Sequence, residues 1–320
     1  MIIRNIGYHQ NVFFELNKFR ELNGVPVFLK LEGFNLSGSI KLKPAIFMIQ
    51  QMEAKGIIHP KLNSIIESSS GNLAKALAQI CHSKGYKFTA VVDQNTTKEV
   101  LDWLSLFNAE TIVIIEPDAN GGYLESRIKK IKEIISKDPN CVWINQYANT
   151  DNVDSHYYTT AREIIADFPD PDYVFVGAGT TGTLGGIVKF FSEFHPTTKI
   201  VAVDAAGSVT FSKPPSPRFI PGIGTSRKPE ISEQLDKKKL HDIIWVSEEK
   251  GIKTCYRLLN DYSILVGGST GSVVAGMLTY ANRFNQGDIV ICISPDFGHK
   301  YMDTVYNPSW VENKFHFTIK

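Results

Sequence analysis

Short apolar runs alternate with longer amphipathic stretches along most of the chain. Val25–Leu31 and Phe88–Val92 are compact apolar runs typical of buried strands. Ala45–Ala54 and Asn72–Ser83 carry apolar residues at helical spacing, and each is followed by a glycine that ends it. Strands that alternate with helices favour parallel sheets covered by helices on both faces.

The same pattern continues to the C-terminal part of the chain, with a few features of its own. Asn11–Leu22 is predicted as a peripheral helix, and Ser155–Asp167 and Ser272–Phe284 are each predicted as one helix. The stretch 207–229 is rich in Pro, Gly and Ser and is predicted as a long functional loop. Two runs of alternating elements meet near residue 145. This pattern predicts two doubly wound, three-layer α/β domains with a cleft between them, and ligands in such sheets bind at the carboxyl ends of strands.

Composition narrows the classes of function. The 320 residues have a formal net charge of +1, which gives no electrostatic support for a nucleic-acid or membrane partner. The four cysteines lack the spacing of a metal site, so no metal is expected. The N-terminal residues show no signal-peptide pattern, and no apolar run has the length of a membrane span. The expected location is therefore the cytoplasm.

The stretch around Lys41 combines several features of a reactive site. A turn-forming cluster, residues 35–39, follows the strand Val25–Leu31, and Lys41 then stands at the start of a helix. The positive end of the helix dipole opposes a lysine charge there, and partial burial lowers the pKa of the amine further. A neutral lysine amine can form a Schiff base. The alternative is a surface lysine that happens to follow a turn.

The loop Glu67–Asn72 follows a predicted strand and precedes a helix. Its small residues Ser69, Ser70 and Gly71 direct hydroxyl and backbone N–H groups to one point. Such a point is an anion site suited to a carboxylate. An ordinary serine cap of the helix is the alternative.

The loop Gly177–Thr183 follows the predicted strand Tyr173–Val176 and matches the pattern G-x-G-x-x-G. One interpretation is a dinucleotide site, with Asp204 ending the next strand. The other is a cradle for a single phosphate at a helix N-terminus, which the threonines of this loop would serve. The first βαβ unit, where a dinucleotide loop usually stands, has no such pattern.

Two further stretches are candidates for a site. Val266–Ser272 is predicted as a turn between a strand and a helix, where Ser269 could face a heteroatom of a cofactor ring, although a plain capped turn is the alternative. Gln146 and Tyr147 lie in an Asn- and Tyr-containing cluster at the expected domain junction.

Together these stretches resemble the fold-type II pyridoxal-phosphate (PLP) enzymes of the cysteine synthase and cystathionine β-synthase family, a tryptophan synthase β-like fold. The family shows K-x-E-x-x-N-P-x-G-S-x-K-D-R around its Schiff-base lysine, and residues 30–43 read K-L-E-G-F-N-L-S-G-S-I-K-L-K. Its T-S-G-N loop corresponds to residues 69–72, its G-T-G-G-T loop to 179–183 and its G-G-S-x-G turn to 267–271. The resemblance covers nearly the whole chain in the same order.

Residues 116–124, 143–149, 201–209 and 221–230 look like one branch of this family. That branch contains the N-(2-amino-2-carboxyethyl)-L-glutamate synthases of siderophore and antibiotic pathways. The resemblance implies the use of O-phospho-L-serine and L-glutamate on the way to 2,3-diaminopropionate.

The resemblance also implies a role for each candidate residue. Lys41 forms the Schiff base with PLP and acts as general base, Asn72 contacts the ring oxygen O3′, and Ser269 faces the pyridine nitrogen. Residues that hold the cofactor phosphate are Gly179, Thr180, Thr181, Gly182 and Thr183. Residues expected at the amino-acid substrates are Ser69, Ser70, Gly71, Gln146, Tyr147, Arg127 and, as a second choice of cation, Arg227.

For the domains, the resemblance implies a smaller mobile domain, residues 36–145, and a larger domain made of residues 1–35 and 146–320, in a homodimer. The chain departs from the family at Leu36, at Leu42-Lys43 and at Ala74. Leu42-Lys43 replaces Asp-Arg and is expected to remove an ion-pairing position beside Lys41.

Three other functions stay open on the sequence alone. Within the family, the enzyme could use sulfide or a thiol, like a cysteine synthase or a cystathionine β-synthase. The glycines of the loop Gly177–Thr183 are also compatible with an NAD-dependent oxidoreductase. A non-catalytic binding protein with the same fold is the third alternative.

Overall fold

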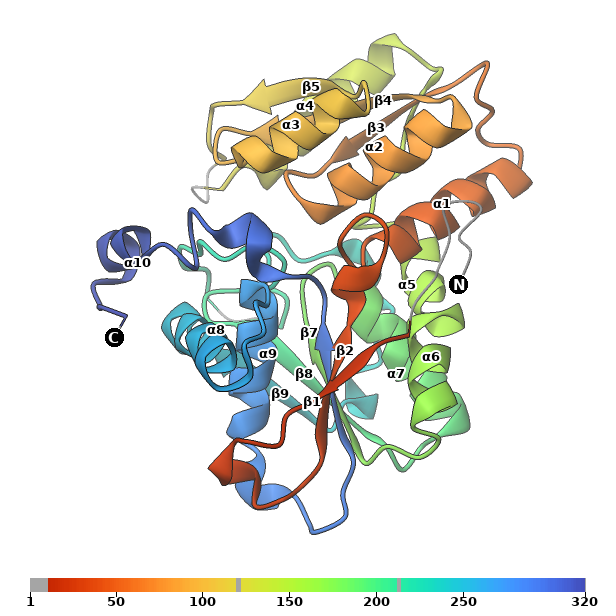
Figure 1. Cartoon of the computed structure of the whole chain (residues 1–320). Helices are drawn as coiled ribbons and strands as arrows, with labels where there is room; N and C mark the ends of the chain where they lie inside the picture. Colours follow the sequence, from red (N-terminus) through yellow and green to blue (C-terminus); the bar gives the residue numbers. More distant parts are fainter. Residues whose placement is uncertain (1–10, 119–121, 212–213, 320) are drawn as a thin grey trace.

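The fold contains two β-sheets, one above the other in Figure 1, each covered by helices. It is described from a computed structural model, which describes residues 11–118, 122–211 and 214–319. The larger sheet has the strand order β1-β2-β10-β7-β8-β9. Its strands are β1 (Phe13–Glu15), β2 (Val27–Leu31), β7 (Tyr173–Gly177), β8 (Lys199–Ala205), β9 (Asp242–Val246) and β10 (Val290–Ser294).

The smaller sheet has the order β5-β4-β3-β6, and all of its strand pairs are parallel. Its strands are β3 (Ser64–Ser68), β4 (Lys87–Asp93), β5 (Glu110–Ile114) and β6 (Cys141–Trp143). The larger sheet is parallel except for the antiparallel pair of β1 with β2. The α-helices are α1 (Leu42–Ala54), α2 (Asn72–Lys84), α3 (Lys98–Leu106), α4 (Leu124–Lys137), α5 (Asp151–Tyr158), α6 (Thr160–Asp167), α7 (Gly182–Phe194), α8 (Glu248–Tyr262), α9 (Gly268–Leu278) and α10 (Pro308–Phe315).

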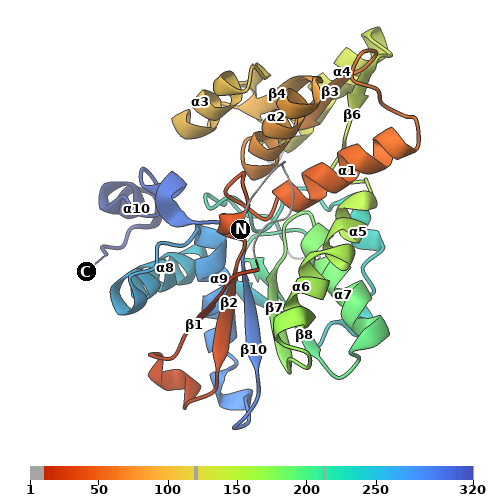
Figure 2. The ribbon, with the colours of Figure 1, turned by 45° about the vertical axis from the view of Figure 1, so that its right-hand side comes forward.

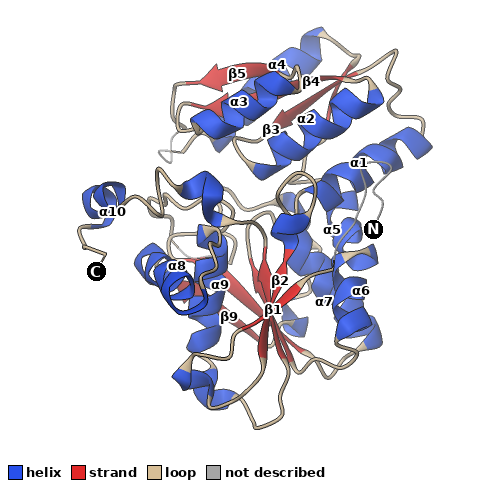
Figure 3. Ribbon diagram, viewed as in Figure 1, coloured by secondary structure: helices blue, strands red, loops and turns tan. Residues whose placement is uncertain are grey.

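Helices cover both faces of each sheet, as the turned view in Figure 2 and the colouring by secondary structure in Figure 3 show. On the larger sheet, α8 and α9 share one apolar core and α5, α6 and α7 share the core of the opposite face. On the smaller sheet, α1, α2 and α3 lie on one face, and α4 packs its Ile131 against the other. This arrangement confirms the predicted α/β class with two doubly wound, three-layer units.

The predicted N-terminal helix, Asn11–Leu22, is wrong. The segment contains the short strand β1 and a 3-10 helix, Arg20–Leu22. Phe13 and Phe14 point to opposite faces of the strand, where Phe13 packs on Phe168 and Phe14 packs on Tyr262. Consecutive residues of a strand point to opposite faces, so adjacent aromatic residues can pack into two different cores. The helix was predicted because the Phe and Leu residues of this segment are also spaced as in an amphipathic helix.

Two other helix predictions had wrong boundaries. The single helix predicted over Ser155–Asp167 is divided at Thr159 into α5 and α6. The helix predicted from Ser272 begins already at Gly268, so the predicted turn Gly267–Gly271 is largely the first turn of α9. A Cβ at Gly271 would lie 2.3 Å from the sulfur of Cys255 in α8, so this glycine permits close packing of two helices rather than a turn.

The long loop between β8 and the 3-10 helix Glu230–Glu233 has neither a helix nor a strand among its described residues, as predicted. In the described part of the chain, no helix combines the length and the apolar character needed to cross a membrane.

Candidate active site

A cavity of about 400 Å³ lies where loops of both sheets meet. The loops after β3, β6 and β7 all contribute to its wall, as expected for the carboxyl ends of parallel strands. The sequence-predicted residues that line it are Lys41, Ser69, Ser70, Gly71, Asn72, Arg127, Gln146, Tyr147, Gly179, Thr180, Thr181, Thr183 and Ser269. Gly182 and Arg227 are not among the lining residues.

Lys41 is the residue immediately before α1, and the N–H of Ile40 fixes this segment by donating to the carbonyl of Pro295 at 2.8 Å. Burial lowers the pKa of the Lys41 amine to about 8, and the nearby carboxyl of Glu67 opposes this shift. Among the described residues, no carboxylate lies within ion-pair distance of the amine. Lys41 is therefore a half-buried residue whose amine becomes neutral and nucleophilic with a small rise in pH.

Glu67 is fully buried at the end of β3, and the sequence analysis gave it no role. Its carboxyl accepts hydrogen bonds from the N–H of Ser68 at 2.9 Å and of Gln146 at 3.4 Å. Burial raises its pKa to about 7. Burial thus shifts the pKa values of Lys41 and Glu67 toward each other, in the direction that favours the neutral form of each group.

The loop before α7 has the features of an anion cradle. The side chain of the N-cap residue Thr181 makes no capping hydrogen bond, and the N–H of Gly182 donates to the hydroxyl of Thr180 at 3.4 Å. A helix N-terminus of this kind favours an anionic ligand. Thr181 has the left-handed φ of 69°, and its buried hydroxyl has no hydrogen-bond partner in the described structure. A Cβ at Gly182 would come within 2.2 Å of Asn152, so a larger residue would displace the neighbouring amide.

Asn72 joins the smaller sheet to the segment that follows β10. Its amide nitrogen donates to Asp296 at 2.7 Å, and Lys300 donates to its amide oxygen. Asp296 also accepts from the hydroxyl of Tyr301 at 2.8 Å and forms an ion pair of 2.6 Å with Lys300. These contacts hold the orientation of the Asn72 side chain at the cavity wall.

Ser69 and Ser70 differ in what they contact. The hydroxyl of Ser69 accepts from the N–H of Ala74 at 3.2 Å. Ser69 therefore makes the helix-capping contact that was considered above as the alternative to an anion site. The hydroxyl of Ser70 accepts from Nη1 of Arg127 at 3.0 Å. Arg127 is only 8% exposed and pairs with Asp93 at 3.1 Å, so it is not a solvated surface arginine.

Gln146 and Tyr147 complete this side of the cavity. The amide nitrogen of Gln146 donates to the carbonyl of Ser68 at 3.3 Å. Burial raises the pKa of the Tyr147 hydroxyl, and Arg127 is close enough to oppose that shift. Arg227, in contrast, forms ion pairs with Glu125 at 3.3 Å and Glu230 at 3.4 Å.

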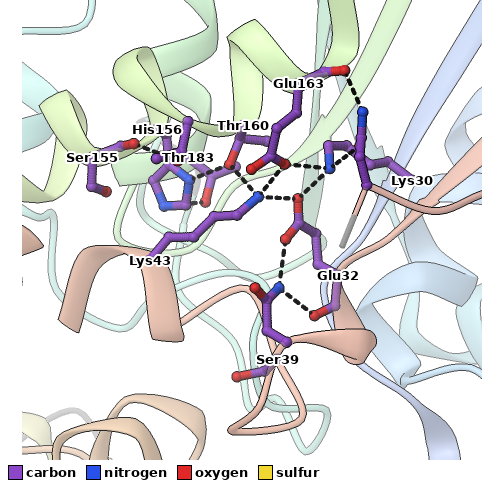
Figure 4. A network of polar contacts seen from close by, with 12 residues as sticks. Lys30, Glu32, Ser39, Lys43, Ser155, His156, Thr160, Glu163 and Thr183 are labelled. Atoms are coloured by element: carbon purple, nitrogen blue, oxygen red, sulfur yellow. Dashed lines mark hydrogen bonds and ion pairs between the residues drawn. The ribbon is translucent and has the colours of Figure 1, made fainter. Parts of the chain in front are cut away.

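Lys43 corrects the expectation that an ion-pairing position is lost beside Lys41. Its amine forms ion pairs with Glu32 at 2.7 Å and with Glu163 at 2.5 Å (Figure 4). Lys30 pairs with the same two carboxylates at 2.9 and 2.6 Å. Lys43 therefore occupies the position of the family's arginine as a buried cation.

A chain of polar contacts leads from Lys43 to the loop before α7 (Figure 4). The amine of Lys43 lies 3.4 Å from the hydroxyl of Thr160, which lies 2.9 Å from Nδ1 of His156. Nε2 of the same imidazole lies 3.2 Å from the hydroxyl of Thr183. His156 is fully buried, and burial together with Lys41 and Lys43 lowers its pKa well below the ordinary value. The ring is therefore neutral, with one nitrogen protonated.

The sequence analysis missed several residues of this site. Glu67 lies in the predicted strand, where its burial could not be read from the pattern. Asp296, Lys300 and Arg218 lie after β10 or in the long loop after β8, where no periodic pattern separates a buried polar side chain from a solvated one. His156 stands in a predicted helix, where a histidine is usually structural.

In the described part of the chain, no group of histidines, cysteines and carboxylates could hold a metal ion.

This geometry defines a class of protein: a two-sheet α/β protein in which a lysine with a lowered pKa and an anion cradle at a helix N-terminus line the same cavity. The model of the pyridoxal-phosphate dependent enzyme family matches residues 6–296. The chain belongs to that family, which is PLP-dependent and catalyses β-elimination and β-replacement.

Solved structures agree with this assignment. The chain is similar to cysteine synthase from Entamoeba histolytica, with 28% identity, a TM-score of 0.87 and coverage of 96% of this chain and 91% of that chain. It is similar to the O-acetylserine dependent cystathionine β-synthase from Helicobacter pylori, with 28% identity, a TM-score of 0.84 and coverage of 96% and 100%. O-ureido-L-serine synthase gives 27% identity, a TM-score of 0.84 and coverage of 95% and 93%.

The residues present fit PLP. The cofactor needs an amine for its aldehyde and a cradle for its phosphate. Lys41 provides an amine whose pKa is lowered by burial, and the N-terminus of α7 with the unpartnered hydroxyl of Thr181 provides a cradle. Membership of this family excludes two alternatives that the sequence alone left open, namely an NAD-dependent oxidoreductase and a non-catalytic binding protein.

Proposed function

We propose that the enzyme joins O-phospho-L-serine and L-glutamate to give N-(2-amino-2-carboxyethyl)-L-glutamate and phosphate. In this reaction the Cβ–O bond of phosphoserine breaks, and phosphate leaves with the bonding electrons. A Cβ–N bond to the glutamate amine forms, and that amine loses a proton. The product is a precursor of 2,3-diaminopropionate, consistent with a siderophore or antibiotic pathway.

The observation that carries the proposal is the contact between Arg127 and Ser70. A buried arginine donates to the substrate loop at 3.0 Å inside the cavity. Sulfide needs no such cation, whereas a phosphate leaving group or a glutamate carboxylate needs a paired positive charge when it is removed from water. The cavity therefore suits anionic substrates.

Each residue has a proposed task. Bound PLP supplies an electron sink for the substrate's α-carbon. Lys41 attaches the cofactor, then removes the Cα proton of phosphoserine through its neutral amine and later returns a proton there. Ser69, Ser70 and Gly71, with Gln146, hold the substrate carboxylate.

The cofactor contacts are proposed on the same basis. Residues Gly179, Thr180, Thr181, Gly182 and Thr183 hold the phosphate through N–H groups and hydroxyls. Asn72 contacts the ring oxygen, in the orientation that Asp296 and Lys300 support. Ser269, 3% exposed at the start of α9, faces the ring nitrogen as a neutral partner.

Arg127 and Tyr147 are proposed to hold the second substrate. Arg227, the second choice of cation, does not line the cavity and has no part in this proposal. We also propose that residues 36–145 move as the smaller domain against residues 1–35 and 146–320, in a homodimer. The hydrophobic core that unites α1, α2, β3 and β4 supports this division.

A second candidate is a β-replacement with sulfide or a thiol. The similarity to an O-acetylserine dependent cystathionine β-synthase and to a cysteine synthase favours it. Mass spectrometry separates the two after incubation of the PLP-loaded enzyme with phosphoserine or O-acetylserine and with glutamate, sulfide or homocysteine. The proposal predicts the glutamate adduct from phosphoserine as the main product, and efficient use of sulfide with O-acetylserine alone would refute it.

A further inference from the structure

Arg218 is a second arginine in the wall of the cavity, and it lies in the long loop between β8 and β9. The residues that follow it fix this part of the loop. The N–H groups of Phe219 and Ile220 donate to the carboxylate of Glu248 at 2.8 and 2.6 Å. Arg218 therefore projects from an anchored segment rather than from a free loop.

The guanidinium itself is held against a glycine-containing turn. Nη1 of Arg218 donates to the carbonyl of Ile223 at 3.2 Å. A Cβ at Gly224 would lie 2.7 Å from the same nitrogen, and Gly224 has a φ of +72° that favours glycine. The close approach of the arginine to the backbone thus depends on this glycine, which also lines the cavity.

Two of the other cavity cations each have one carboxylate partner. Arg127 pairs with Asp93 at 3.1 Å, and Lys300 pairs with Asp296 at 2.6 Å. Burial lowers the pKa of the remaining one, Lys41, to about 8.

Arg218 has no such partner. Within residues 11–118, 122–211 and 214–319, no carboxylate lies in ion-pair distance of it, although Glu248 and Asp204 act on it from farther away. Its Nε is buried and has no hydrogen-bond partner. A buried, cationic donor without a partner at the wall of a binding cavity is best satisfied by an anionic ligand.

We propose that Arg218 binds the α-carboxylate of the entering amino acid. The inference rests on the proposed function, in which glutamate brings two carboxylates to the cavity. Arg127 extends from α4 of the smaller sheet beside the substrate loop, whereas Arg218 extends from the loop after β8 of the larger sheet. Two arginines from two different sheets give glutamate one cation for each carboxylate, with Arg127 at the side chain.

The test compares Arg218→Gln and Arg218→Lys with the matched control Arg227→Gln, because Arg227 belongs to the same loop but does not line the cavity. Loss of a charge-assisted hydrogen bond predicts a KM for glutamate raised by about tenfold or more in Arg218→Gln. Arg218→Lys is expected to fall between that variant and the wild type, and Arg227→Gln to match the wild type. The KM for phosphoserine and the rate of phosphate release from it stay unchanged.

A substrate analogue identifies the carboxylate. 4-Aminobutanoate has the amine and the distal carboxylate of glutamate but no α-carboxylate, so its KM should be the same in Arg218→Gln and in the wild type. An equal rise of KM for both amines would overturn the inference. So would a glutamate KM that does not change, or a loss of phosphate release that places Arg218 at the phosphate of phosphoserine.

A binding measurement separates this inference from the proposed function. Calorimetric titration of the PLP-loaded proteins uses glutarate, which has two carboxylates and no amine to react. If wild-type enzyme forms no glutamate adduct, the proposed function fails. Glutarate binding that is lost in Arg218→Gln and kept in Arg227→Gln would still support Arg218 as the carboxylate site, and equal binding by all three proteins would overturn it.

Discussion

Nε2 of His156 lies 3.2 Å from the hydroxyl of Thr183, and Nδ1 of the same ring lies 2.9 Å from the hydroxyl of Thr160. Lys43 can only donate to the oxygen of Thr160, and we expect the hydroxyl proton of Thr160 to be directed at Nδ1. In that arrangement Nε2 carries the proton of the neutral ring and donates to Thr183, and the hydroxyl proton of Thr183 is free to point into the cavity.

This arrangement predicts the protonation state of His156. The ring should stay neutral, protonated on Nε2, at pH 6.5 and also below it, because burial holds its pKa well below the ordinary value of 6.5. Nitrogen-15 NMR of the imidazole distinguishes the two tautomers and the charged form. A ring that titrates near pH 6.5, or that carries its proton on Nδ1, would contradict the direction of this chain of donors.

The buried cluster around Glu32 predicts a large loss of stability in Glu32→Gln. Glu32 is 1% exposed and lies between Lys30 and Lys43, which together hold its pKa far below the usual range. Removal of the carboxylate leaves two buried cations with only Glu163 between them, at a loss of roughly 3–5 kcal/mol in the free energy of unfolding.

The matched control for Glu32→Gln is Asp102→Asn, which breaks the exposed pair of Lys98 with Asp102. That change should alter the free energy of unfolding by at most about 1 kcal/mol. Denaturant unfolding monitored by circular dichroism measures both variants. Similar losses in the two would show that the buried cluster adds nothing beyond an ordinary surface pair.

The raised pKa of Glu67 predicts how the free energy of unfolding changes with pH. Its folded-state pKa of about 7 lies above the ordinary value of 4.5, so the folded protein holds the proton more tightly than the unfolded chain does. The resulting stabilisation is fully present below pH 4.5 and is lost as the pH rises through 7. Its size is about 3 kcal/mol.

Glu67→Gln should remove this dependence, because glutamine keeps the shape of the side chain and does not titrate. Urea unfolding of the cofactor-free protein between pH 4.5 and 8 gives the slope for both proteins. Parallel slopes in the variant and the wild type would mean that Glu67 has an ordinary pKa.

We expect Arg127→Ala to affect the two halves of the reaction, phosphate release and formation of the glutamate adduct, differently. The variant should still release phosphate from phosphoserine but should fail to form the glutamate adduct, because the cation for the glutamate side chain is missing. Phosphate release and product formation are measured separately, with Arg227→Ala as the control. If phosphate release is lost as completely as adduct formation, Arg127 belongs to the phosphoserine site instead.

The sequence predicted the architecture because alternation of strands and helices is a local property. It predicted most of the cavity wall for a related reason: the loops after β3, β6 and β7 converge once the strands are parallel. It failed at the N-terminus, where the partners of Phe13 and Phe14, namely Phe168 and Tyr262, are distant in sequence.

Other residues could not be predicted because their roles depend on tertiary contacts. Arg218 and Arg227 belong to the same loop and look alike in sequence, yet only Arg218 lines the cavity. The difference arises from the anchoring of Phe219 and Ile220 on Glu248, which follows β9. Lys43 was misjudged similarly, since Glu163, one of its partners, lies far along the chain.

The assignment of Lys41 as the cofactor-bearing residue has two rivals nearby, Lys43 and Lys300. Both rivals form ion pairs with carboxylates, at 2.7 Å to Glu32 and at 2.6 Å to Asp296, which favours their charged, non-nucleophilic forms. Lys41 has the lowered pKa of about 8.

Borohydride reduction of the PLP-loaded enzyme, followed by peptide mapping with mass spectrometry, tests this central claim most directly. The account predicts the pyridoxyl group on Lys41 alone, and no reducible adduct in Lys41→Ala although that variant keeps its fold by circular dichroism. A pyridoxyl group on Lys43 or Lys300 of the wild-type enzyme would contradict it.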